Sequence, residues 1–535
     1  MTDLRTRSEV SGPAGAGPPT LARYRSPWWG FKAAWRRNRD LLDGASSLAA
    51  TTGVTSVLGF AYWALAARLF SQRAVGYGSA AVSAITLLGI VGMLGLGTVL
   101  IGELPRRRVR GGLISAALVT SGLGSLVLGL AFILVAPHIS YHFRNMSSTL
   151  AQATLFAAGV MLTGASLVFD QATIGLSRGG LQLLRNLAFA AAKLAILPVC
   201  AIILHDQFGV GITLSWVTAT ALSLLLVALR LRLAGTSVLP RPNWHVLRGL
   251  GGTAIAHSWL NLAITVPRSL MPVLVTVIVS PSANAAFYAA WTLSGFLYLV
   301  PTHLATVLFA VASADPQKIA RKLRFSLRLS VLIGVVGMAA LGLCARLALS
   351  MFGASYERAA TVPLLLLLIG YLPSIPKVHY IAVCRATGRI KTAAAVLTAA
   401  ATLEVAAAVA GGAYGGMKGL ILALLSVFVL EGLVTTPAVA RAAIGHGRHR
   451  RAGPVHVATE NPLRMEQARG DRSSYRDSGL AGRVPSHQLL APASVGKDRE
   501  ADAAADRRAR QGEGISALLS LARSASVYPP QLPPY

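Results

Sequence analysis

Long apolar stretches recur along the chain and are separated by short polar or basic segments. A helix needs about 20 apolar residues to cross the hydrocarbon of a bilayer, and twelve stretches reach that length. They are 46–67, 79–102, 112–136, 150–174, 183–204, 211–233, 250–279, 285–312, 327–350, 362–384, 392–411 and 417–440. The pattern therefore predicts twelve membrane-spanning helices, numbered here as spans one to twelve.

Span seven, residues 250–279, contains two features that are costly inside a membrane helix. Pro267 removes a backbone hydrogen bond, and Arg268 places a charge among apolar residues, with Pro272 following one turn later. Together these features predict a broken helix that lines a cavity, as in many transporters. The alternative is a kinked span whose arginine extends towards the outer headgroups.

Composition supports a membrane protein of the all-helical class. The 535 residues are 54% hydrophobic and only 13% charged, whereas soluble domains carry about 25% charged residues. The formal net charge of +30 suggests nucleic-acid binding until the positions of the charges are considered. They gather in alternate loops, so no nucleic-acid partner is expected.

The loop charges predict the orientation of the protein. The side shared with the N-terminus carries Arg106, Arg107, Arg108, Arg110, Arg178, Arg230, Arg232, Arg241, Arg248, Lys318, Arg321, Lys322, Arg324, Lys377, Arg385, Arg389 and Lys391. The other side carries little more than Arg68, Arg73, Arg144, Arg358 and Lys418. By the positive-inside rule, both termini are expected in the cytoplasm, with the protein in the bacterial inner (plasma) membrane.

The chain divides into five segments. A basic N-terminal segment, 1–44, mixes tryptophans with cations and is expected to lie on anionic inner-leaflet lipids. An N-terminal lobe, 45–233, and a C-terminal lobe, 250–440, contain six spans each and are joined by a cytoplasmic linker, 234–249. The polar tail, 441–535, is expected to be disordered and dispensable for transport.

Four segments resemble the bacterial polysaccharide and O-antigen flippases of the multidrug/oligosaccharidyl-lipid/polysaccharide (MOP) exporter superfamily. They are RLFSQRAVGYG (Arg68–Gly78), FDQATIGLSRGGLQLLRN (Phe169–Asn186), the stretch from Pro272 to Pro301, and FGASYERAATVPLLLLLIGYLPSIP (Phe352–Pro376). Most positions in each segment are merely small or apolar, but their order and spacing extend over residues 40–440. The long tail has no counterpart in the family pattern.

The resemblance implies two six-helix lobes around a central cavity lined by spans one, two, seven and eight. It also implies a cargo, a polyprenyl-pyrophosphate-linked oligosaccharide flipped from the inner to the outer leaflet by alternating access. The expected partners are this lipid, the bilayer and glycan-assembly enzymes, without a cofactor or metal. Arginine binds phosphate oxygens bidentately and stays charged, so Arg268 is the first candidate for a headgroup ligand. Lys193, Pro267 and Pro301 are further candidate substrate-binding residues.

Four other ionisable residues lie within the apolar spans and are candidates for charge coupling: Asp170, Arg185, Glu404 and Glu431. Asp170 and Arg185 flank a cytoplasmic hairpin, where a structural salt bridge is the simpler interpretation. Glu431 suits a proton site or a structural role equally well. Lys193 and Glu404 lie about 210 residues apart, close to the offset of a faint internal repeat. We therefore hypothesise an ion pair between the lobes that forms in only one access state.

Other function classes remain open or are disfavoured. The sequence has no GxxxxGK[ST] loop for ATP, and every expected outer loop is short, so an enzyme is not expected. A cation or drug antiporter of the same superfamily would share the fold but needs an acidic cavity. A non-transporting scaffold that recruits partners through its tail is the third hypothesis.

Overall fold

The computed structural model describes residues 39–107, 110–144, 149–204, 208–235, 240–314 and 319–445, and it is helical throughout these ranges. The N-terminal segment before residue 39 and the tail after residue 445 lie outside the described residues, so the predictions made for them stay predictions.

The N-terminal lobe contains the helices that correspond to spans one to six. They are α2 (Arg39–Leu69), α3 (Gln72–Gly92), α4 (Leu96–Glu103), the 3-10 turn η1 (Leu104–Arg106), α5 (Gly111–Ile139), α6 (Tyr141–Arg144), α7 (Leu150–Gly175), α8 (Gly179–Ile203) and α9 (Val210–Leu233). The predicted linker contains a short helix, α10 (Trp244–Gly249), which the sequence analysis did not expect.

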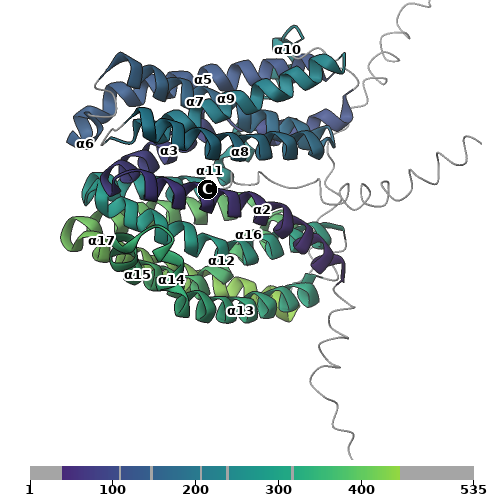
Figure 1. The fold of residues 1–535 in the computed structure, drawn as a ribbon. Helices are drawn as coiled ribbons and strands as arrows, with labels where there is room; N and C mark the ends of the chain where they lie inside the picture. The colour runs from purple at the N-terminus through teal and green to yellow at the C-terminus, as the bar shows by residue number, and fades with distance from the viewer. Residues whose placement is uncertain are drawn as a thin grey trace, which may run out of the picture.

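The C-terminal lobe contains the remaining spans. Its helices are α11 (Gly251–Ile278), α12 (Pro281–Ala314), α13 (Ile319–Leu343), α14 (Ala345–Ser350), α15 (Ala354–Ile369), α16 (Tyr371–Ala386) and α17 (Ile390–Ile444). Each of the twelve predicted apolar runs coincides with helix. Among the described residues, nine helices are long and apolar enough to cross a membrane, or ten if α15 and α16, bent by 47°, form one span. Figure 1 shows two stacked groups of helices, with α5, α7, α8 and α9 in the upper group and α12, α13 and α15 to α17 in the lower, and with α2 running beside α12.

The helix α17 accounts for two of the predicted spans. Its 55 residues would extend about 80 Å as one rod, far more than the bilayer thickness. Gly416 has φ 58° and ψ −149°, which breaks the helix. A Cβ built on Gly411 would lie 2.4 Å from the carbonyl oxygen of Gly419, so the chain turns back on itself there. Spans eleven and twelve are therefore a tight helical hairpin.

The predicted break in span seven is wrong. Pro267 and Pro272 both lie inside the single helix α11, because membrane helices tolerate proline when other groups satisfy the freed carbonyls. The two prolines leave the carbonyls of Ala263 and Arg268 without their helical N–H partners. The breaks occur instead in span two, where Leu94 and Gly95 take positive φ values, in span nine between α13 and α14, and in span ten between α15 and α16.

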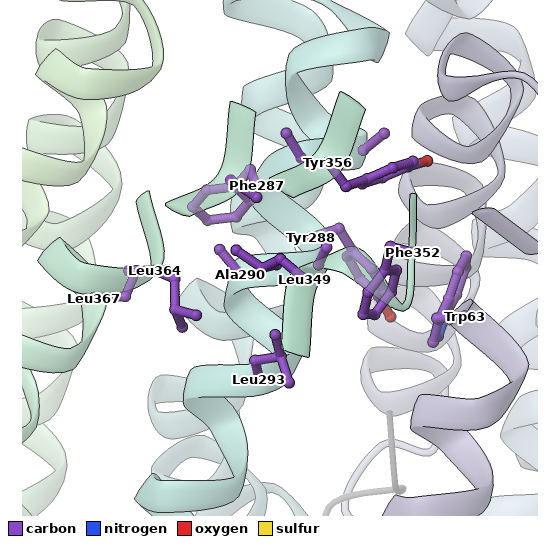
Figure 2. Close-up of a cluster of buried hydrophobic side chains, with 14 of the residues drawn as sticks. Trp63, Phe287, Tyr288, Ala290, Leu293, Leu349, Phe352, Tyr356, Leu364 and Leu367 are labelled. Carbon is purple, nitrogen blue, oxygen red and sulfur yellow. The ribbon is translucent and has the colours of Figure 1, made fainter. Parts of the chain in front are cut away.

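The two lobes meet along a seam formed by α2 and α3 on one side and α11 and α12 on the other. This arrangement agrees with the expectation that spans one, two, seven and eight surround the centre. The largest buried apolar cluster spans both lobes at this seam, and Figure 2 shows part of it, with Trp63 facing Tyr288 and Phe352.

The orientation of the termini gives the first prediction. Reporter fusions after Arg110 and Arg389, in the basic loops, should report a cytoplasmic location, and fusions after Asp206 and Ser282 should report the exterior. Alkaline phosphatase and fluorescent-protein fusions give opposite signals on the two sides and check each other. Reversed signals at any two of these sites would contradict the twelve-span topology.

Candidate transport site between the lobes

Arg268 lies at the seam, near the middle of the part of α11 that is expected to cross the membrane. The ends of the seam are called outer and cytoplasmic here according to the orientation predicted from the loop charges. Arg268 precedes the outer end of α11 by ten residues, which corresponds to about 15 Å, half the hydrocarbon thickness. The side chain is half-buried. Its Nη2 atom lies beside Gly295 of α12, where a Cβ would be 3.6 Å away, and it is within electrostatic range of Tyr298. The guanidinium thus packs beside Gly295, where a methyl group would make only ordinary van der Waals contact with it.

The two proline candidates lie in the same pair of helices. Pro267 and Pro301 are both buried, within α11 and α12 respectively. Proline has no N–H and its ring is apolar, so these residues shape the helices beside Arg268 rather than offer polar ligands. Their predicted contact with cargo stays a prediction.

Glu404 and Glu431 share one lysine inside the C-terminal lobe. Lys377 Nζ donates to a carboxylate oxygen of Glu404 and, at 2.9 Å, to Glu431 Oε2. Both glutamates are 7% exposed. The second oxygen of Glu431, Oε1, has no hydrogen-bond partner in the described part of the chain. The cluster joins α16 to both halves of α17 and carries two formal negative charges for one positive.

Lys377 was placed with the cytoplasmic loop charges, and that placement is wrong. It lies in α16, the inner half of span ten. From sequence alone, a single lysine eight residues before Arg385 is easily assigned to the same basic loop. The presence of two glutamates in the following spans was the signal that could have identified it, because buried carboxylates need a partner.

Lys193 occupies an aromatic cage in the N-terminal lobe. Its Nζ lies 4.9 Å from the ring centroid of Tyr62, 4.7 Å from Phe189 and 4.5 Å from Trp216. The residue is 1% exposed. Aromatic faces are electron-rich and stabilise a cation, so these rings take the place of a carboxylate around the ammonium group.

The hypothesised ion pair between Lys193 and Glu404 is not formed in this conformation. Lys193 lies on α8, which packs on α2 and α9, whereas α17 packs on α11, α13, α15 and α16. The seam is made by other helices, so the two residues belong to the interiors of separate lobes. Equal spacing in a repeat places residues at equivalent positions but does not make them neighbours.

The predicted structural salt bridge between Asp170 and Arg185 is confirmed. Arg185 Nε and Nη2 donate to the two oxygens of Asp170 at 2.7 and 2.5 Å. Both residues are buried and fasten α7 to α8 beside their cytoplasmic hairpin. A bidentate pair of this kind is matched in geometry and charge. A role in charge coupling stays a prediction.

The outer end of the seam is held by contacts that the sequence analysis did not identify. Asn284 of α12, fully buried, donates from Nδ2 to the Gly76 carbonyl at 2.8 Å and to Ser79 Oγ at 3.0 Å. A Cβ on Gly76 would lie 1.7 Å from the carbonyl oxygen of Pro281, so only glycine permits this approach of α3 to α12. Arg68 donates to the Ser350 and Met351 carbonyls at 2.6 and 2.9 Å.

The cytoplasmic half of the seam has a looser polar contact. Asn261 of α11 donates to Thr98 Oγ1 of α4 at 3.3 Å and accepts from Arg385 of α16, also at 3.3 Å. These distances are longer than those at the outer end. The outer end is thus the more firmly closed end of the seam.

Removing the Asn284 contact should open the outer end more often. Two net hydrogen bonds stabilise the closed end by about 1 kcal/mol each, so Asn284→Ala should raise the open population about tenfold or more. The measurement uses a variant in which Cys200, Cys344 and Cys384 are replaced by Ala and Ala80 is replaced by Cys. Residue 80 lies on α3 one turn further from the outer end than Gly76. We expect a membrane-impermeant thiol reagent added outside to label it correspondingly faster.

A matched control for this prediction is Thr220→Val. It removes a buried hydroxyl whose hydrogen bond, to the Trp216 carbonyl at 2.9 Å, stays within α9. It should leave the labelling rate unchanged. Equal labelling rates in Asn284→Ala and Thr220→Val would show that Asn284 does not hold the outer end.

Comparison with known proteins shows what the fold resembles. No protein-family model matches the chain, and no curated protein matches its sequence. Solved structures do match. The inward-facing conformation of a multidrug resistance MATE family transporter of the MOP superfamily matches 74% of this chain and 96% of its own, with a TM-score of 0.58 and 15% identity. The fold is that of the MATE transporters.

Two further structures support this assignment of the fold. An outward-facing conformation of a multidrug resistance MATE family transporter covers 76% of this chain and 96% of its own, at 14% identity and a TM-score of 0.50. A MOP superfamily transporter from Pyrococcus furiosus covers 76% and 96% at 12% identity and a TM-score of 0.50. Its description states that the reverse polarity of its binding pocket suggests a different function.

Proposed function

We propose that this protein flips a polyprenyl-pyrophosphate-linked oligosaccharide from the inner to the outer leaflet of the bacterial plasma membrane, with both termini in the cytoplasm. The observation that carries the proposal is the position of Arg268. A guanidinium halfway across the membrane, between α11 and α12 at the seam, is placed to receive a pyrophosphate that would otherwise be costly to move through hydrocarbon. The four sequence segments that resemble polysaccharide flippases support the same cargo class.

The acidic cluster is assigned to charge coupling within the same proposal. Glu404 and Glu431 hold one cation, Lys377, between them and keep one oxygen unpartnered among the described residues. A cluster with this imbalance is a natural place for a mobile positive charge to bind and leave. Glu404 and Arg268 both interact electrostatically with Tyr298. The cluster is therefore within electrostatic reach of the cargo site.

A cation antiporter is the second candidate, favoured by the same two glutamates. A drug-sized cation needs carboxylates that are exposed to the cavity, whereas Glu404 and Glu431 are each 7% exposed and both bond to Lys377. The cluster therefore suits a small ion such as a proton rather than a drug-sized cation. Arg268 would in addition repel a cation at the seam. The charges of the seam therefore favour an anionic headgroup.

The test uses the purified protein in vesicles. A fluorescent polyprenyl pyrophosphate that carries a disaccharide is incorporated into both leaflets, and its arrival in the outer leaflet is followed by additional quenching from a membrane-impermeant quencher outside. We expect the protein to accelerate this transfer and to leave the rate at which a cationic dye crosses unchanged. Transport of the dye without the lipid would replace the flippase with the antiporter, and transport of neither would favour the scaffold.

A further inference from the structure

Aromatic side chains join the two lobes along the seam in the outer half of the membrane. The ring centroid of Trp63 on α2 lies 4.6 Å from that of Tyr288 on α12. One turn along α2, the ring centroid of Phe60 lies 6.2 Å from that of Phe296 on α12 and 5.3 Å from that of Phe352, in the turn between α14 and α15. Figure 2 shows Trp63, Tyr288 and Phe352 facing one another between the helices. Each of these contacts must separate when the lobes part.

Three polar groups at this seam are buried without a hydrogen-bond partner in the described part of the chain. They are Trp63 Nε1, Thr292 Oγ1 and Tyr356 Oη, on residues that are 1%, 5% and 2% exposed. Buried donors are nearly always paired in folded proteins, and leaving them unpaired destabilises the state that contains them. Three such donors beside one set of aromatic contacts indicate groups that are satisfied in another state of the protein.

The donors lie next to the candidate headgroup ligand. Tyr288, Thr292 and Gly295 are spaced four and three residues apart on α12, so they follow one another along one face of the helix. Gly295 is the residue beside the Arg268 guanidinium. A molecule whose phosphates contact Arg268 would therefore place its next groups, towards the outside, against Thr292 and then against Trp63 and Tyr288.

We propose that this seam, formed by Phe60, Trp63, Tyr288, Thr292 and Tyr356, is a sugar-binding surface that takes the pyranose rings of the cargo when the lobes separate; it rests on the function proposed above. A pyranose has one face of C–H groups and a rim of hydroxyls. The C–H face packs on aromatic rings, and the hydroxyl oxygens accept hydrogen bonds from an indole N–H or a side-chain hydroxyl.

The same donors disfavour other molecules at this surface. A hydrocarbon chain would cover the rings but leave the three donors unpaired. A cation would gain from the aromatic faces, but the indole N–H is a donor only and cannot bond to it. A ligand with both apolar faces and acceptor oxygens can cover the aromatic rings and also accept hydrogen bonds from the three donors. Sugars are ligands of this class.

The proposal is tested by binding two probes to the purified full-length protein. One is polyprenyl pyrophosphate that carries a disaccharide, and the other is the same lipid without sugar. We expect the wild type to bind the glycosylated lipid at least tenfold more tightly. Trp63→Phe retains an aromatic ring but removes the N–H group, and Thr292→Val retains the shape but removes the hydroxyl. Each should remove most of that preference, about tenfold for one hydrogen bond, without weakening binding of the bare lipid.

Controls separate this proposal from a purely structural role and from failure of the proposed function. Trp259→Phe makes the same chemical change at an exposed residue of α11 and should retain the wild-type preference. Thr292→Val removes an unsatisfied donor at nearly unchanged volume, so its thermal midpoint should not fall. Trp63→Phe also removes buried ring volume, so a modest fall in its thermal midpoint is expected. Equal binding of both lipids by the wild type, or equal weakening of both in the variants, would overturn the sugar-binding assignment alone. Binding of neither lipid would overturn the proposed function as well.

Discussion

Replacing Arg268 by Ala is expected to lower the rate at which the lipid-linked oligosaccharide is flipped by about a hundredfold or more. Hydrogen bonds to charged groups contribute about 1.5–3 kcal/mol each, and a guanidinium supplies two of them to a pyrophosphate. Arg268→Lys keeps the charge but loses the planar group that can form two parallel hydrogen bonds. Its rate should therefore lie between those of the wild type and Arg268→Ala. Arg268→Glu should be the slowest, because it places like charges together. The rates are measured in vesicles with the fluorescent carrier.

The control for this series is Arg346→Ala. Arg346 is an exposed arginine of α14, a helix that packs mainly on α13 and α15. Its removal should leave flipping within twofold of the wild type. In cells, Arg268→Ala should cause glycosylated carrier to accumulate on the inner leaflet at normal protein levels. Unchanged export in that variant would reduce Arg268 to a structural residue and leave the proposed function without its main support.

The spans could be predicted from sequence because the bilayer imposes a length. Each crossing needs about 20 apolar residues, and that requirement holds whatever the helices pack against. The same reasoning located the hairpin between spans eleven and twelve, where Gly411, Gly416 and Gly419 permit the backbone to turn and approach itself. Helix breaks were less predictable. Pro267 suggested a break that does not occur, whereas the break at Leu94 and Gly95 has no proline at all.

The contacts between side chains could not be predicted, because they depend on which helices become neighbours. Arg185 was paired correctly with Asp170 because only a short hairpin separates them. Glu404 was assigned the wrong partner for this conformation, since its neighbour Lys377 is set by the packing of α16 against α17. The role of Asn284 was not predicted, because a single asparagine at the start of an apolar run resembles a helix cap. Only the fold shows that its side chain contacts Gly76.

The buried cluster of Lys377 makes the last prediction. Replacing Lys377 by Met should destabilise the C-terminal lobe by about 3–5 kcal/mol, the range observed when one partner of a buried ion pair is removed. Glu404 and Glu431 would then face each other across α17 without a cation, and both are 7% exposed. The measurement is the thermal midpoint of the protein in detergent, together with its amount in the membrane. Lys418→Met removes an exposed lysine and should change neither.

A compensated variant separates stability from coupling. In Lys377→Met combined with Glu404→Gln and Glu431→Gln, all three charges are gone, and neutral amides replace the carboxylates at similar size. Much of the lost stability should return, because no uncompensated charge remains buried. Transport should stay low in this triple variant, since no group is left to bind and release a positive charge. Restored stability with full transport would show that the cluster is structural and that coupling occurs elsewhere. An unaltered thermal midpoint in Lys377→Met alone would show that the lysine does not compensate the two carboxylates.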